Sequence, residues 1–320
     1  MKRLLMFFAL LLLILVSACG NNETNAGTSE DTPEANSSEE SKSEESNTDS
    51  SSDTFTYESE NGPVELPKEP KRVVALYFGG SILSLDANIV GVDSWTKNSP
   101  LFRDKLTDAQ VVTEEDLEKI IELDPDVIIG LSSMKNIDQL KEIAPTVTFT
   151  YGKLDYLEQH IEIGKVLNKE EEAKNWVKDF QKRAQSAGDE IRAKIGEDAT
   201  VSVVETFDKQ LYVFGDNWAR GTEILYQEMN LKMPEKVKED ALEPGYFAIS
   251  PEVLPEYAGD YIILSKEPGS ETSFEETETF KNIPAVKNNQ LFVADANKFY
   301  FNDPITLEYQ LQFFKDHFLK

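Results

Sequence analysis

Two segments of this chain repeat each other, and the repeat restricts the fold more than any other feature. Residues 117–129 read LEKIIELDPDVII, and residues 251–263 read PEVLPEYAGDYII. Aligned without a gap at an offset of 134 residues, the copies match at Glu118 and Glu252 and again at Asp126 and Asp260. Each copy predicts a short helix, a turn and then a buried strand. A duplicated unit of this kind indicates two similar α/β lobes.

Strand-like and helix-like stretches alternate around both copies. In the first half, apolar runs at 72–76, 89–92, 127–130 and 146–150 predict strands, and residues 81–87 and 136–143 predict amphipathic helices. In the second half, strands are predicted at 200–205, 211–214, 261–264 and 291–295, and helices at 222–229 and 303–319. Such alternation predicts an α/β fold in which each lobe has a mainly parallel central sheet covered by helices.

One long helix is predicted between the two halves, over residues 169–195. Its apolar residues recur every three or four positions and form one stripe, and Gly196 is a natural stop. At ~1.5 Å per residue the helix is about 40 Å long, enough to join two lobes side by side. We therefore expect an N-terminal lobe at 55–168, a bridging helix at 169–196, a C-terminal lobe at 197–320, and a ligand cleft between the lobes.

The N-terminus is typical of a bacterial secretory signal. Lys2 and Arg3 precede an unbroken apolar run over residues 4–16, which is shorter than the ~20 residues that span a bilayer. Ser17 and Ala18 then precede Cys19, the single cysteine of the chain. A small residue before cysteine resembles the lipobox of bacterial lipoproteins, which implies acylation (for example by palmitate) at Cys19 and a signal peptide over residues 1–19. The alternative is an ordinary secreted protein with an incidental cysteine.

Residues 20–54 are expected to form a disordered acidic tether. They contain ten acidic residues against one lysine and have no aromatic residue. Such a segment cannot bury enough apolar surface to offset the entropy lost on ordering. The whole chain has a net charge of -27, which argues against nucleic acid and against flat docking on anionic lipid.

Aromatic side chains follow nearly every predicted strand. Ligands of open α/β sheets bind beyond the carboxyl ends of the strands, so these positions are candidates for a ligand-lining wall. Taken singly, each is better explained as a core residue, but as a set they predict a ligand site. The set comprises Tyr77, Phe78, Trp95, Tyr151, Tyr212, Trp218, Phe299 and Tyr300.

Arg220 adds a planar donor with a permanent charge, two residues after Trp218. The alternative for Arg220 is a surface ion pair in an acidic protein. A highly anionic ligand would call for several cations, whereas the strand ends offer Arg220 and only scattered lysines.

The chain offers little to a resident metal or to hydrolytic chemistry. Its two histidines, His160 and His317, are isolated, and its only cysteine is Cys19. No zinc site of the usual kind and no nucleophile–histidine arrangement is predicted, so we expect no cofactor and no enzyme activity.

Several of these features together resemble the substrate-binding proteins of iron–siderophore ABC transporters. They are the lipobox, the acidic segment, the opening PKRVVAL at 70–76, the Glu118 and Glu252 units, APTV at 144–147 and the bridging helix. The stretch YVFGDNWARGTE at 212–223 is similar to the hydroxamate branch, the FhuD-like receptors of Gram-positive bacteria. The resemblance covers residues 55–320.

The resemblance implies a lipid-anchored, monomeric receptor on the outer side of the cell membrane. It implies that a ferric hydroxamate siderophore contacts Trp218, Arg220 and Tyr212, with Tyr151 and Tyr300 as further contacts. From the strand-end set we add Trp95 and Tyr77 to the predicted ligand-binding residues. It also implies that Glu118 and Glu252 dock on the two subunits of an ABC permease; from the residues alone, both are solvated carboxylates at helix starts. The alternatives are a receptor for a catecholate siderophore, haem or a corrinoid, an enzyme that processes siderophores, and a surface adhesin.

Overall fold

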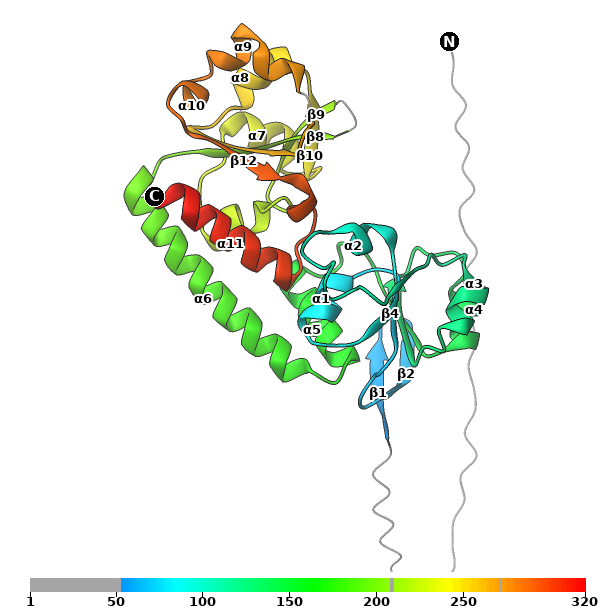
Figure 1. Cartoon of the computed structure of the whole chain (residues 1–320). Coiled ribbons are helices and arrows are strands. Elements are labelled where there is room, and N and C mark those ends of the chain that lie inside the picture. Colours follow the sequence, from blue (N-terminus) through cyan, green and yellow to red (C-terminus); the bar gives the residue numbers. More distant parts are fainter. Residues whose placement is uncertain (1–52, 208–209, 271) are drawn as a thin grey trace, which may run out of the picture. The chain divides into compact units, whose positions relative to one another are not determined.

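The computed structural model describes residues 53–207, 210–270 and 272–320 (Figure 1). The predicted signal peptide, Cys19 and the predicted tether up to residue 52 lie outside the described residues. The tether was expected to reach residue 54, but Thr54 already begins the first strand.

The first half of the chain forms a five-stranded parallel sheet in the order β5-β4-β3-β6-β7. Its strands are β3 (Val73–Ala75), β4 (Ile89–Val92), β5 (Gln110–Val111), β6 (Val127–Leu131) and β7 (Thr146–Phe149). Its helices are α1 (Gly79–Ser84), α2 (Ser94–Asn98), α3 (Leu117–Glu122), α4 (Ile137–Ile143) and α5 (Tyr156–Val166). All four strands predicted here are confirmed. The fifth, β5, has two residues and is too short to produce a pattern.

An antiparallel hairpin precedes this sheet, formed by β1 (Thr54–Ser59) and β2 (Gly62–Pro67). Its turn contains Asn61 followed by Gly62, a strong hairpin signal that the sequence analysis did not use. Tyr57 and Leu66 are buried and join the hydrophobic core of the first half, so the hairpin is part of the folded unit.

The predicted bridging helix is confirmed as α6 (Glu170–Ile195), which ends at Gly196 with φ of 105°. Its apolar stripe contributes to two cores. Ala173 packs in the core of the first half, while Phe180 and Ile191 pack in the core of the second. One continuous helix face therefore supports both halves of the chain.

The second sheet has the order β10-β9-β8-β11-β12. Its strands are β8 (Val201–Phe207), β9 (Gln210–Phe214), β10 (Tyr246–Ile249), β11 (Tyr261–Lys266) and β12 (Leu291–Asp295). Strands β8, β11 and β12 are parallel to one another. Strand β9 is antiparallel to both of its neighbours, β8 and β10. The fold class is confirmed with this refinement. Only two residues separate β8 from β9, and a parallel crossover needs about a dozen.

The helices of the second half are mostly short. They are the π-helix η1 (Glu223–Glu228), α7 (Glu235–Ala241), the 3-10 turn η2 (Pro251–Val253), α8 (Leu254–Tyr257), the 3-10 turn η3 (Ser273–Glu276), α9 (Glu278–Lys281), α10 (Pro284–Lys287), the 3-10 turn η4 (Ala296–Lys298) and α11 (Pro304–Phe318). The segment predicted as a helix at 222–229 has π geometry, because the Met229 N–H donates to the Ile224 carbonyl at 2.8 Å.

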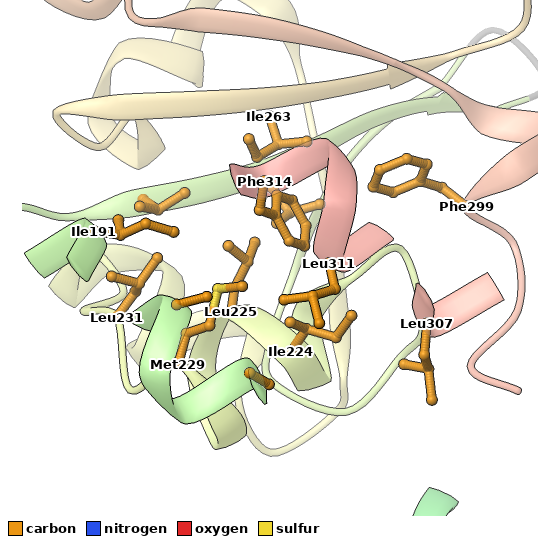
Figure 2. Packing of buried hydrophobic residues seen from close by; sticks show 14 of the residues in the cluster. Ile191, Ile224, Leu225, Met229, Leu231, Ile263, Phe299, Leu307, Leu311 and Phe314 are labelled. Carbon is orange, nitrogen blue, oxygen red and sulfur yellow. The ribbon is translucent and has the colours of Figure 1, made fainter. Parts of the chain in front are cut away.

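The halves are joined by more than the single helix that was expected. After η4 the chain returns to the first half, where Phe301 packs against Phe102 with ring centroids 5.5 Å apart. Helix α11 then runs into the second core, where Figure 2 shows Leu311 and Phe314 among residues of α6, η1 and β11. Residues 299–305 thus form a second connection that local sequence patterns do not reveal.

The repeated units occupy equivalent places in the two sheets. Asp126, just before β6, accepts hydrogen bonds from the backbone N–H groups of Lys71 at 2.6 Å and Arg72 at 3.0 Å. Asp260, just before β11, accepts from the Thr200 N–H at 2.8 Å. In both sheets the aspartate therefore fixes the start of the neighbouring strand, β3 or β8, which gives this matched residue a structural role.

Candidate ligand-binding site

Arg220 lies in a loop after β9 whose backbone has an unusual conformation. Ala219, Arg220 and Gly221 have φ values of 56°, 58° and 80°. For the two residues with a Cβ, this region costs roughly 1–2 kcal/mol each. The Arg220 N–H donates to the Phe299 carbonyl at 2.9 Å, and the Ala219 N–H donates to Glu223 Oε1 at 2.8 Å. The loop is therefore held in a strained form, as is common where a side chain must be presented to a ligand.

One edge of the Arg220 guanidinium is bound to Glu205 of β8. Nε donates to the two carboxylate oxygens at 3.1 and 3.3 Å, and Nη2 donates to Oε1 at 2.9 Å. Glu205 is fully buried and also accepts a hydrogen bond from Ser265 Oγ at 2.7 Å. The alternative for Arg220, an ion pair, is thus realised, but with a buried partner instead of one at the surface.

The other edge of the guanidinium keeps free donors. Nη1 donates to the Trp218 carbonyl at 3.4 Å. A guanidinium has five N–H groups, and the contacts with Glu205 and Trp218 use three of them. The remaining two, one on each Nη, have no acceptor within residues 53–207, 210–270 and 272–320. A fixed fork with open donors suits oxygen acceptors of a ligand.

Aromatic rings from both halves of the chain surround this guanidinium. Phe214 and Tyr300 each have their ring centroid 5.2 Å from Arg220 Cζ. Trp95, which follows β4 of the first sheet, meets Tyr300 edge-on at 5.4 Å and stacks on Phe207 at 6.5 Å. Residues that follow strands of the two sheets are thus in contact here, and their role as a ligand-lining wall stays a prediction.

Tyr77 and Tyr151 follow β3 and β7, and their ring centroids lie 6.3 Å apart. Burial, and then the neighbouring Tyr151 and Asp93, raise the pKa of Tyr77 to about 12, while the charge of Arg220 acts against this shift. Burial and the carboxylate of Glu223 raise the pKa of Tyr151, and Arg220 again opposes the shift. Arg220 is therefore near enough to act electrostatically on both tyrosines.

Tyr212 and Trp218 meet through a third ring, that of Tyr246 in β10. The centroid of Tyr246 lies 5.8 Å from that of Tyr212 and 5.0 Å from that of Trp218. Gly245 has φ of 86°, and a Cβ there would overlap the Trp218 ring. The close approach of backbone to indole thus requires glycine at this position.

The rings of this surface are open to solvent to different degrees. The exposed ones are between 38% and 61% accessible and comprise Tyr77, Trp95, Tyr151, Phe207 and Tyr246. Tyr212, Trp218 and Tyr300 are half-buried. Phe207 and Tyr246 were not singled out from the sequence; Tyr246 follows Pro244-Gly245 and opens an apolar run, which is a usable strand signal. Phe299 was expected at the wall but is fully buried in the second core.

Two hollows of the described part of the chain lie away from this surface. A hollow of about 550 Å³ lies between the β1–β2 hairpin and the segment from α4 to β7, and another of about 360 Å³ lies beside η1 and α7. None of the predicted ligand residues lines either one. The aromatic surface is the candidate site, because a guanidinium fixed by a buried carboxylate converges there with exposed rings. The cleft between the lobes stays a prediction.

Glu118 and Glu252 are both exposed and occupy matching places. Glu118 is in the first turn of α3, and Glu252 is in η2, which leads into α8. A hydrogen bond from the Ser250 side chain lowers the pKa of the exposed Glu252 carboxyl group. Their geometry suits contact with a partner, but docking stays a prediction.

Within residues 53–207, 210–270 and 272–320, no three His, Cys, Asp or Glu side chains form a group that could hold a metal ion. His160 is buried in α5 against the Trp176 ring, and burial lowers its pKa to about 4. No helix of the described part is long and apolar enough to cross a membrane.

Known proteins are similar to this chain in both sequence and fold. A family profile described as "Periplasmic binding protein" matches residues 81–298. The iron(3+)-hydroxamate-binding protein FhuD of Bacillus subtilis (strain 168) is 37% identical over 98% of this chain and 96% of its own length. The FhuD protein from S. pseudintermedius has a TM-score of 0.75 at 36% identity, covering 84% of this chain and 99% of that one. FhuD2 from Staphylococcus aureus with bound ferrioxamine B has a TM-score of 0.73 at 38% identity, covering 78% of this chain and 98% of that one. With its two α/β halves, its bridging helix and these matches, the chain belongs to the periplasmic binding protein family.

Proposed function

We propose that this protein is an extracytoplasmic receptor that binds ferric hydroxamate siderophores and delivers them to an ABC permease. The observation that carries the proposal is the guanidinium of Arg220, fixed between the rings of Phe214 and Tyr300 with two N–H groups open. The relatives named for hydroxamates or ferrioxamine B support it. Its family consists of binding proteins for transport, so no bond is made or broken.

The chemistry of the cargo fits this surface. In a ferric trihydroxamate, six ligand oxygens saturate the iron and leave little net charge around it. The receptor therefore needs no metal ligand of its own. It needs donors aimed at the hydroxamate oxygens and apolar faces for the organic scaffold, and a guanidinium among aromatic rings supplies both.

The proposed contacts with the siderophore are the seven residues identified in the sequence, together with Tyr246 and Phe207. The seven are Trp218, Arg220, Tyr212, Tyr151, Tyr300, Trp95 and Tyr77. The spread of ring contacts over both halves of the chain supports a ligand held between residues 55–168 and residues 197–320, with residues 169–196 as the brace.

We also propose that a lipid at Cys19 anchors the protein, as a monomer, on the outer face of the cell membrane. Residues 20–54 would then act as the tether. Mass spectrometry of the purified protein tests the anchor: Cys19→Ala should abolish an N-terminal diacylglycerol adduct, and an unmodified wild-type Cys19 would contradict the proposal.

For docking, we propose that Glu118 and Glu252 each contact one permease subunit. Exposed charge pairs act mainly on orientation and association rate. The double variant Glu118→Ala/Glu252→Ala should lose uptake of labelled ferric siderophore while keeping its affinity in solution. An equal loss of affinity would instead indicate a structural role.

Tryptophan fluorescence tests the binding function. Trp95 and Trp218 belong to the aromatic surface, whereas Trp176 packs on Phe180 and donates to Glu308 at 3.1 Å. Ferric hydroxamates should quench the emission with submicromolar affinity, and Trp176→Phe should keep most of the quench. Titration against a ferric catecholate, haem and cobalamin provides the comparison, and tighter binding of any of these would overturn the assignment.

A further inference from the structure

The charge of Arg220 is compensated inside the site, and this has a consequence for the kind of ligand that the site accepts. Glu205 is fully buried and binds the guanidinium through both Nε and Nη2. The carboxylate and the guanidinium are both nearly desolvated, since the Arg220 side chain is 18% exposed and the Glu205 side chain is 1% exposed. In such surroundings charges are weakly screened, so the pair presents hydrogen-bond donors with almost no net charge.

Two carboxylates lie next to rings of the site. Tyr300 Oη donates to Glu267 Oε1 at 3.4 Å, and Asp93 caps α2 next to Trp95 by accepting from the Thr96 N–H at 2.9 Å. Glu267 thus contacts a ring of the aromatic surface directly, and Asp93 lies two residues before Trp95.

Two nearby lysines do not offset these carboxylates. Lys266 is paired with Glu275 at 2.7 Å, and Lys298 is paired with Asp295 at 3.6 Å. Lys135 is exposed in the loop after β6. Arg220 is thus the cation at the centre of the surface, and Glu205 cancels its charge.

We propose that Glu205 is a specificity-determining residue: by neutralising Arg220 it makes the site favour ferric complexes with no charge or a positive charge and disfavour anionic ones. The inference rests on the proposed function, because it names the charge class within the hydroxamates. Glu205 acts through Arg220 and need not touch the ligand.

Three ligands that share one ferric hydroxamate core but differ in net charge test the effect of ligand charge on affinity. Ferrioxamine B carries a terminal ammonium group, N-acetylation removes that charge, and N-succinylation replaces it with a carboxylate. The full-length protein in detergent, titrated with each by tryptophan quenching, should bind ferrioxamine B at least about fivefold more tightly than the succinyl derivative, a difference of roughly 1 kcal/mol.

Glu205→Gln keeps a hydrogen-bonding side chain but removes the charge, and it should shrink or invert this ratio by at least about fivefold. Glu267→Gln should shift the ratio in the same direction by less, and it decides the matter if Glu205→Gln folds poorly. Glu190→Gln, exposed on α6, is the matched control for total charge and should leave the ratio unchanged.

Affinities within about twofold across the three wild-type titrations would overturn the inference. Equal losses for all three ligands in Glu205→Gln would also overturn it, since a residue that merely positions Arg220 acts on every ligand alike. Failure of all three ligands to bind the wild-type protein would instead refute the proposed function.

Discussion

Removing the Arg220 side chain should weaken the fold as well as the binding of ligand. In Arg220→Ala, the fully buried carboxylate of Glu205 loses its cation and keeps only the hydrogen bond from Ser265 Oγ at 2.7 Å. The unpaired charge then has no solvent around it in the folded state, whereas the unfolded chain hydrates it fully. The unfolded state gains in relative stability for that reason.

The size of the effect follows from the burial of the pair. Removing one partner of a buried ion pair costs about 3–5 kcal/mol. The Arg220 side chain is 18% exposed, so water can enter the space it leaves, and we expect the lower end of that range, about 3 kcal/mol. At roughly 2–4 °C per kcal/mol for a domain of this size, the Tm should fall by about 6–12 °C.

The assay combines thermal unfolding by circular dichroism with ligand titration. Binding of ferrioxamine B to Arg220→Ala should weaken at least about tenfold, because charge-assisted hydrogen bonds each contribute about 1.5–3 kcal/mol. The double variant Glu205→Gln/Arg220→Ala should recover most of the lost Tm and none of the lost affinity. This separates the two roles of Arg220.

Two results would refute the reasoning. If Arg220→Ala unfolds within about 2 °C of the wild type, the buried carboxylate does not depend on its cation. If the double variant stays as unstable as Arg220→Ala, the instability comes from the strained loop and not from the charge of Glu205.

Three further outcomes follow from the packing. In Gly80→Ala the new Cβ would overlap the Asp303 carboxylate, so the variant should lose about 1–3 kcal/mol in denaturant unfolding, and an unchanged midpoint would contradict the contact. Burial raises the pKa of Asp303 to about 6, so the contribution of this carboxyl group to stability falls as the pH rises from 4 to 6. Over that range the free energy of unfolding of Asp303→Asn should rise relative to that of the wild type by up to about 3 kcal/mol. Parallel pH profiles of the two proteins would contradict this expectation. Burial lowers the pKa of His160 to about 4, so between pH 6.5 and 4 the unfolded chain binds a proton at this residue and the folded chain does not. His160→Phe should therefore lose less stability than the wild type as the pH falls through this range. The Tm at pH 7 is the control, because a lower value there would show that loss of the imidazole disrupts packing on Trp176.

Local sequence patterns were enough to predict most helices and strands and the class of the fold. The strands β4 and β12 have the predicted bounds, and α6 begins one residue later than expected. These features depend on the periodicity and length of apolar stretches, which are properties of neighbouring residues. The hairpin β1–β2 also had a local signal, at Asn61-Gly62, so its omission was avoidable.

Local patterns could not predict the mixed sheet or the second connection between the halves. The antiparallel pairing of β9 and β10 depends on connection lengths, and the return of residues 299–305 depends on where Phe301 finds a hydrophobic partner. Neither is a property of one segment.

Local sequence pattern is enough to place aromatic residues and one arginine near strand ends, because such patterns locate the strands. The role of the arginine there follows from long-range contacts instead. Glu205 precedes Arg220 by 15 residues, and Ser265 lies 60 residues beyond Glu205, yet all three meet in one hydrogen-bonded group. Their meeting depends on β8 lying beside β11 and on the strained loop after β9, and no spacing along the chain specifies a contact that two different strands and a loop create together.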